Sequence, residues 1–415
     1  MSRSFDDCFA YDRALIPVAD AQARLRAHLT AKAGTVTVTL DQAQGRYLAE
    51  PLQSPRNVPA FDNVAVDGWA VRFDPAMAQT ALTWPIQPGR AAAGHPFEGT
   101  IMAGHALRVL TGAVLPTGAN TVILQEECRI NGDHVRLPGG IKAGANCRPA
   151  GEDITAGETL FAPGHQLRPQ DIGAAALMGY GSLPVFEPIK MAVFSTGDEV
   201  IEPGSPAAEG AVYDANRPML KALLANLPVD VTDLGRLADD AQSVAQALHD
   251  AADRFDVVLT SGGASQGDED HIARTLTQHG TLHFWRIALK PGRPMAFGQL
   301  KDTMFIGLPG NPVAAFVCFQ LFAKPVLARL GGGHWPVPKH YPVTLAHNIK
   351  KRPGRLEMVR ATVSMAGDVM LAHKIKKQGS GVLTSLVEAD GLLALDHDLT
   401  DPPAGTIVPF WPFET

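Results

Sequence analysis

The sequence predicts a multidomain α/β protein built around a doubly wound parallel sheet. Apolar strand-like runs alternate with helical patterns between Ile189 and Leu330. This alternation is typical of βαβ units. Short β-like pieces separated by turn residues lie on both sides of this region, within 71–140 and 341–395. Because 415 residues exceed one ordinary core, we expect about two to four domains.

The composition is that of a globular protein with no general affinity for polyanions. Hydrophobic residues make up 46% of the chain and the formal net charge is −6, so we expect no nucleic-acid partner. The four cysteines lie far apart and form no CxxC pair, which argues against a zinc ribbon or a disulfide framework. No apolar run suggests a membrane span and the N-terminus has no signal-peptide h-region. We therefore expect a cytoplasmic protein without membrane association.

The first 187 residues predict two domains, one inserted into the other. Residues 17–29 have the pattern of an amphipathic helix, and Thr35–Leu40 alternates as a half-buried strand does. An Ala-rich helix predicted over Gln170–Met178 returns to these elements, whereas the hairpin signal Ile130–Asp133 belongs to a small β-rich domain between them. The predicted boundaries are 1–50 with 150–187 for the outer domain and 51–149 for the inserted one.

Residues 188–331 predict the doubly wound domain, and residues 332–415 predict a final β-rich, barrel-like domain. Pro312 opens a long apolar helix that continues to Leu330, and the glycines at 331–333 indicate a linker. The strands predicted for the sheet are Met191–Phe194, Val229–Leu234, Val257–Leu259, Leu282–Ala288 and Phe305–Leu308.

Small residues, with acids after the first two, follow three of these strands, at Ser195–Glu199, Ser261–Asp270 and Pro309–Pro312. Loops that follow parallel strands meet at one edge of the sheet, where ligands bind in open α/β folds. Glycines and helix N-termini at such an edge can cradle a phosphate group. The sequence therefore predicts one composite site made by separate loops.

Charged residues in and between these loops suit a phosphorylated ligand and a divalent cation. Lys290 and Arg293 can neutralise phosphate, and Asp198, Glu199 and Asp270 can hold Mg²⁺ through oxygen ligands. No GxxxxGK[ST] or HExxH pattern occurs, which excludes a P-loop or a zincin site. Each feature also has an ordinary structural interpretation. The glycines and acids could form a capped strand-to-helix turn, and Lys290 could be a surface lysine. From the residues alone, we predict a Mg²⁺-dependent enzyme acting on a phosphorylated small molecule.

Seven motifs, in order, resemble those of the molybdopterin molybdenumtransferase family (the MoeA family), which includes the E-domain of gephyrin. The resemblance covers nearly the whole chain. The motifs are Phe61-Asp62-Asn63 with Asp67-Gly68, Gly151-Glu152-Asp153, Phe194–Glu199, Tyr213–Arg217, Ser261-Gly262-Gly263, Lys290–Pro294 and Leu308–Pro312.

This resemblance implies an activity and an assembly. The family inserts molybdate into adenylylated molybdopterin with the help of Mg²⁺, which releases AMP and yields the molybdenum cofactor. Its members are elongated homodimers with four domains per chain, and the cleft lies between the doubly wound domain of one subunit and the inserted domain of the other. The adenylyltransferase of the same pathway would be a further partner.

The resemblance also implies roles for particular residues. Those expected to act in catalysis are Asp67, Asp153, Glu199, Asp270 and Lys290, with Asp198, Glu199 and Asp270 as metal ligands. Those expected to bind substrate are Asp62, Thr111, Arg148, Ser195, Thr196, Ser261, Gly262, Gly263, Arg286, Arg293, Pro309, Pro312, Arg355 and Ser380.

The chain departs from the family pattern at three places. Only Arg148 remains of a run of arginines that usually precedes Gly151, Val64 replaces a serine, and Arg286 replaces a common lysine. A non-catalytic homologue that binds the pterin or serves as a scaffold is therefore a competing hypothesis. A general nucleotide-phosphate enzyme that shares the doubly wound domain is a third one.

Overall fold

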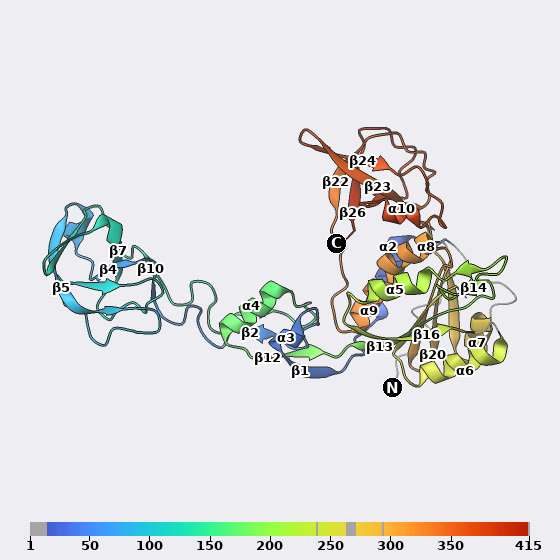
Figure 1. The fold of residues 1–415 in the computed structure, drawn as a ribbon, viewed down its shortest axis with the longest axis horizontal. Helices are drawn as coiled ribbons and strands as arrows, with labels where there is room; N and C mark the ends of the chain where they lie inside the picture. Colours follow the sequence, from blue (N-terminus) through green and yellow to red (C-terminus); the bar gives the residue numbers. More distant parts are fainter. Residues whose placement is uncertain (1–14, 238–239, 263–270, 293, 414–415) are drawn as a thin grey trace.

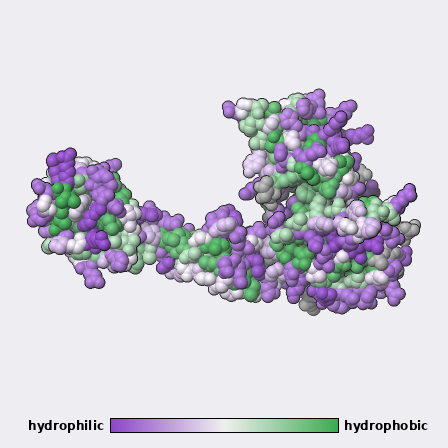
Figure 2. Space-filling view, viewed as in Figure 1, coloured by the Kyte–Doolittle hydropathy of each residue, from purple (hydrophilic) through white to green (hydrophobic). Residues whose placement is uncertain are grey.

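The computed structural model describes residues 15–237, 240–262, 271–292 and 294–413. The chain is elongated (Figure 1), with a β-rich lobe at one end and the large central sheet and a β-barrel at the other. A narrow middle part connects the two ends, as the surface in Figure 2 also shows.

The central sheet is mixed, and its strand order is β16-β13-β17-β21-β20-β18. The first four strands are mutually parallel, whereas β20 is antiparallel to both of its neighbours. Strands β18 and β21 therefore run in the same direction, and their carboxyl ends lie at the same edge of the sheet. The bounds are β13 Ile189–Ser195, β16 Val229–Arg236, β17 Val257–Ser261, β18 Thr281–Arg286, β20 Pro294–Leu300 and β21 Thr303–Leu308.

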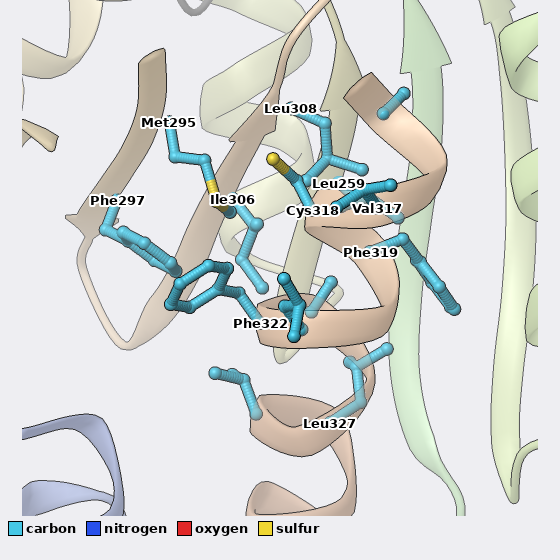
Figure 3. Close-up of a cluster of buried hydrophobic side chains, with 14 of the residues drawn as sticks. Leu259, Met295, Phe297, Ile306, Leu308, Val317, Cys318, Phe319, Phe322 and Leu327 are labelled. Atoms are coloured by element: carbon cyan, nitrogen blue, oxygen red, sulfur yellow. The ribbon is translucent and has the colours of Figure 1, made fainter. Parts of the chain in front are cut away.

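Alternating side chains of the strands supply two separate cores, one on each face of the sheet. Met191 and Val193 of β13 pack with α2, α5 and the long helix, while Ala192 and Phe194 pack with α6 and α7. Figure 3 shows how side chains of the long helix meet those of β17, β20 and β21 on the first face. The helix bounds are α2 Val18–His28, α5 Asn216–Leu224, α6 Ala241–Ala252 and α7 His271–His279. The predicted doubly wound architecture is confirmed, although β20 was not predicted.

The long apolar helix has three segments, α8 (Pro312–Cys318), a π-helical turn η3 (Phe319–Ala323) and α9 (Lys324–Leu330). By length and composition Pro312–Leu330 could cross a membrane, contrary to the prediction that no run is long enough. However, 78% of an 18-residue stretch of this helix is buried inside the protein. Its apolar character is explained by its place in the core.

The N-terminal helix α2 packs on the central sheet rather than on the middle part of the chain. Gln22 Nε2 donates to the carbonyl of Leu321 at 2.7 Å, and Lys32 N–H donates to the carbonyl of Leu330 at 2.8 Å. The sequence predicted this helix as part of the first domain.

The middle part contains two small antiparallel sheets and the helices α3 and α4 around one core. Most of β1 is exposed, so the prediction of a half-buried strand was wrong. The predicted helix over 170–178 is present as α4. The bounds are β1 Thr35–Thr39, α3 Leu40–Ala43, β2 Leu52–Gln53, β11 Thr159–Phe161, α4 Pro169–Met178 and β12 Ser182–Phe186.

The inserted lobe is a six-stranded sheet of order β7-β4-β6-β5-β9-β8, and the predicted hairpin is its β8–β9 pair. Two further strands, β3 and β10, pair beside it. The bounds are β3 Asn63–Val64, β4 Gly68–Val71, η1 Pro75–Ala78, β5 Leu82–Ala91, β6 Ala106–Val109, β7 Thr121–Leu124, η2 Gln125–Glu127, β8 Arg129–Asn131, β9 His134–Leu137 and β10 Cys147–Arg148.

The C-terminal strands close into a barrel, because β23 pairs with both β24 and β25. The short strand β19 extends this barrel towards the central sheet by pairing in parallel with β23. The bounds in the barrel are β19 Leu289–Lys290, β22 Tyr341–Leu345, β23 Leu356–Ala366, β24 Val369–Lys374, α10 Thr384–Val387, β25 Gly391–Leu395 and β26 Ile407–Pro412. Outside the barrel, β14 Val200–Ile201 and β15 Val212–Tyr213 pair with each other in parallel.

Candidate functional site

A cavity of about 700 Å³ lies between the carboxyl edge of the central sheet and the barrel. Gly262 after β17, Pro309–Asn311 after β21 and the loop after β19 form its sheet side, and residues of β23, β24 and nearby loops form its barrel side. The charged side chains around it are Lys290, Lys350, Arg355, Glu357, Arg360 and Lys374. Five of these six are cationic, so the cavity favours an anionic ligand.

Lys290 is held in this cavity by a carboxylate of the barrel. Register places Lys290 of β19 opposite Glu357 of β23, and Lys290 Nζ lies 3.1 Å from Glu357 Oε2. The Lys290 side chain is 55% exposed, whereas that of Glu357 is 9% exposed. An ammonium group has three donors, so Lys290 can contact Glu357 and still donate to a ligand.

The loop that carries Ser380 is fixed from both the barrel and the sheet side. The buried guanidinium of Arg360 donates to Gly379 O and to Ser385 Oγ, each at 3.1 Å, and burial lowers the pKa of Arg360. Val313 N–H, in the first turn of α8, donates to the carbonyl of Ser380 at 3.0 Å. The site therefore includes the junction of the two domains.

Gly292, two residues after Lys290, occupies a position that only glycine fits. Its φ is +118°, and a Cβ at this position would lie 2.5 Å from Cys318 Sγ in α8. The Cys318 thiol is fully enclosed, and burial raises its pKa. The loop between Lys290 and β20 thus passes against the long helix without room for a side chain.

Two of the predicted substrate-binding hydroxyls point into the protein. Ser195, at the end of β13, is buried and donates to Asp214 Oδ2. Ser261, at the end of β17, is 5% exposed and accepts a hydrogen bond from Asn216 Nδ2 at 2.6 Å. Thr196 is half-buried, and its carbonyl would lie 3.5 Å from a Cβ at Gly262. Neither serine borders the cavity.

Asp198 and Glu199 follow β13 at the same edge of the sheet and are both exposed. The described residues contain no cluster of three or more His, Cys, Asp or Glu side chains that could hold a metal by themselves. Mg²⁺ usually retains several waters and binds one or two carboxylates together with substrate phosphates. Two adjacent exposed carboxylates fit that mode of binding.

Several predicted residues lie outside the described part of the chain or do not border the cavity. Gly263, Asp270 and Arg293 are outside the described residues, and so is Gly263–Gly267, which matches the GxSxG pattern of serine hydrolases. That pattern does not by itself decide between a hydrolase and a transferase. Arg286 is exposed at the end of β18, and Pro312 begins α8 next to the cavity.

The predicted residues of the inserted lobe form a separate group, at the opposite end of the elongated molecule from the cavity (Figure 1). Asp67 Oδ1 accepts hydrogen bonds from both the N–H and the Oγ1 of Thr111 at 2.7 Å, and these bonds lower the pKa of Asp67. Asp62 Oδ1 accepts from the N–H of Ala150 at 2.8 Å. Arg148 pairs with Glu152 at 2.7 Å. Asp153 is exposed beside them.

The chain therefore has two groups of candidate residues. One group surrounds the cavity and includes the predicted residues Gly262, Lys290, Pro309, Arg355 and Ser380. The other lies in the inserted lobe, and a single chain does not bring the two together. Among the polar residues of the cavity, the sequence did not predict Lys350, Glu357, Arg360, Lys374 and Gln378. For Lys350 and Lys374, the sequence signal is the concentration of basic residues at 350–355 and 374–377.

Family models match three consecutive parts of the chain. Residues 16–179 match the MoeA N-terminal region (domains I and II), residues 192–329 match a probable molybdopterin binding domain, and residues 342–413 match the MoeA C-terminal region (domain IV). The cavity lies between the parts matched by the second and third models.

Full-length relatives agree with this division. The molybdopterin molybdenumtransferase of Haemophilus influenzae is 36% identical over 406 residues, which cover 96% of this chain and 99% of that protein. Molybdopterin molybdenumtransferase 2 of Mycobacterium tuberculosis is 31% identical over 386 residues, covering 91% and 94% of the two chains. The crystal structure of the molybdopterin biosynthesis MoeA protein from Pyrococcus horikoshii superimposes with a TM-score of 0.82 at 29% identity, covering 96% of this chain and 100% of that one. The chain accordingly belongs to the MoeA family of molybdopterin molybdenumtransferases, which act in molybdenum cofactor biosynthesis.

Proposed function

We propose that this protein transfers molybdate into adenylylated molybdopterin, releasing AMP and forming the molybdenum cofactor with the help of Mg²⁺. The observation that carries the proposal is the cavity at the sheet edge, where five cationic groups and one carboxylate surround about 700 Å³. Molybdate and a pterin that carries phosphates are both anions, and such a cavity attracts them.

The cavity cations would have two tasks. Arg355 can bind an oxyanion through two N–H groups at once, whereas Lys290 and Lys374 act as point charges. Because Glu357 holds Lys290 from one side, the ammonium is oriented before the ligand arrives. Such preorganised donors stabilise the charge that develops on phosphate oxygens as AMP leaves.

Asp198 and Glu199 are exposed at the carboxyl edge of the sheet, where they could hold Mg²⁺ together with substrate phosphates. A bound Mg²⁺ would polarise the phosphoanhydride. We also retain Asp270 as a proposed ligand from the sequence.

Asp67 is better suited to orient a reactant than to accept its proton. Its pKa is lowered by the two hydrogen bonds from Thr111, which makes the carboxylate a weaker base. A carboxylate that stays ionised can instead accept hydrogen bonds from water or from the pterin.

The active unit that we propose is a homodimer in which the inserted lobe of one chain faces the cavity of the other. The separation of the two groups of residues within one chain supports this arrangement. The cytoplasmic location and an adenylyltransferase partner stay predictions from the sequence.

The test follows AMP release by the purified protein mixed with adenylylated molybdopterin, molybdate and Mg²⁺. Release that requires molybdate supports the proposal, whereas binding without AMP release would support the non-catalytic homologue. Co-expression of the variants Asp67→Asn and Lys290→Ala then tests the dimer. Each variant alone should be inactive. With equal expression about half of the dimers are mixed, and each mixed dimer has one of its two sites intact, so about a quarter of the wild-type activity should return. No recovery would contradict a site shared between two chains.

A further inference from the structure

Asn216, the first residue of α5, connects two loops that border the cavity. Its Nδ2 donates to Ser261 Oγ at the end of β17 and to the carbonyl of Gly310 after β21, both at 2.6 Å. The neighbours Gly262 and Pro309–Asn311 form the sheet side of the cavity. One amide therefore sets the distance between two loops that follow adjacent parallel strands.

The turn that carries Asn216 is held by a partly buried ion cluster at the start of α5. The guanidinium of Arg217 contacts Asp214 at 3.1 Å, Asp233 of β16 at 2.7 Å and also Glu202. Asp214 accepts a hydrogen bond from Ser195 at the end of β13 as well. The turn that carries Asn216 is thus fastened to β13 and β16, and its side chain reaches across to β17 and β21.

The carbonyl oxygen of the Asn216 side-chain amide has no hydrogen-bond partner among the residues that the structure describes. This atom, Oδ1, is buried. A buried polar atom without a partner is costly. The same carboxamide thus combines two donor contacts that join the loops with a buried acceptor that is left without a partner.

We propose that Asn216 is a positioning residue for the transfer reaction, which holds the loops after β17 and β21 at the separation that the substrate requires. The inference rests on the proposed function, because it concerns the same cavity. Asn216 does not border the cavity itself, so it acts through Gly262 and Gly310.

The experiment compares Asn216→Ala and Asn216→Asp with Asn226→Ala. Asn226 is an exposed asparagine just after the same helix, and its loss should change nothing. Asn216→Asp keeps the size of the side chain but removes both donors. For both Asn216 variants, kcat for AMP release should fall at least about tenfold, with a smaller change in KM, because misplacement of reacting groups slows the chemical step.

Molybdate affinity depends on the shape of the cavity, and calorimetry on the same proteins measures it without turnover. It should weaken in both Asn216 variants while the melting temperature stays close to that of Asn226→Ala. Unchanged kcat and molybdate affinity in a folded Asn216→Ala protein would overturn the inference, and so would loss of folding in both variants, which would make Asn216 a structural residue. If the wild-type protein releases no AMP, the proposed function fails, and the molybdate affinities alone then decide the inference.

Discussion

Substitution of Gly292 by alanine should destabilise the central domain and the site together. A Cβ at this position would lie 2.5 Å from Cys318 Sγ and 3.2 Å from Leu289 Cδ2, and the backbone has φ +118°. The unfavourable φ costs about 1–3 kcal/mol, and the steric conflict in a packed core costs about 1–3 kcal/mol more. We expect a loss of about 2–6 kcal/mol, a large fraction of the 5–15 kcal/mol that holds a typical protein folded.

Urea unfolding followed by tryptophan fluorescence measures this loss, since Trp285 is buried in the same core. Gly310→Ala is the matched control, because it borders the same cavity but a Cβ there meets nothing within 4 Å. It should change stability by less than about 1 kcal/mol.

A double-mutant cycle separates the two causes of the loss. Cys318→Ala removes the sulfur that the new methyl group would strike, so Gly292→Ala should cost about 1–3 kcal/mol less in that background. The φ contribution stays in both backgrounds. The reasoning is refuted if Gly292→Ala unfolds at the urea concentration of the wild type, or if the costs of the two substitutions simply add.

Three further predictions concern charge and pH. Arg355→Ala should weaken molybdate binding about tenfold in calorimetry, because a bidentate charged contact is lost; unchanged affinity would exclude Arg355 from the anion site. Thr111→Val should raise the pKa of Asp67 towards its ordinary value, since one of the two bonds that lower it is removed, so the acid limb of the pH profile of AMP release should move to higher pH. Asp233 is partly buried, which opposes ionisation, but hydrogen bonds from Lys221, Gly235 N–H and Arg217 lower its pKa to about 2 from 3.8. Its contribution to stability, about 1–2 kcal/mol, should be present above pH 3.8 and lost as pH falls towards 2. The Asp233→Asn protein should be less stable than the wild type at pH 7, and its stability should fall less on acidification. Thermal melts at several pH values measure both differences.

The sheet side of the site could be predicted from the sequence because its signals are local. An apolar strand followed by small residues predicts a loop at the carboxyl edge, as for Ser261–Gly262 and Pro309–Asn311. Local signals did not predict the direction in which side chains point at the end of a strand. Ser195 and Ser261 end neighbouring strands with residues 195 and 261 in register, and both hydroxyls are used inside the protein to hold Asp214 and Asn216.

The barrel side could not be predicted, because in a closed barrel the partners of a strand are distant in sequence, and the loops between strands add residues of opposite exposure. Lys350 and Lys351 are adjacent, yet Lys350 borders the cavity whereas Lys351 is 2% exposed and donates to the carbonyl of Leu399 at 2.9 Å. Glu357 is equally inconspicuous in the sequence, and it meets Lys290 only because β19 pairs in parallel with β23. That pairing joins a loop of the central sheet to the barrel across 67 residues of sequence. The charge of the cavity thus depends on how two domains meet, which no motif within one domain encodes.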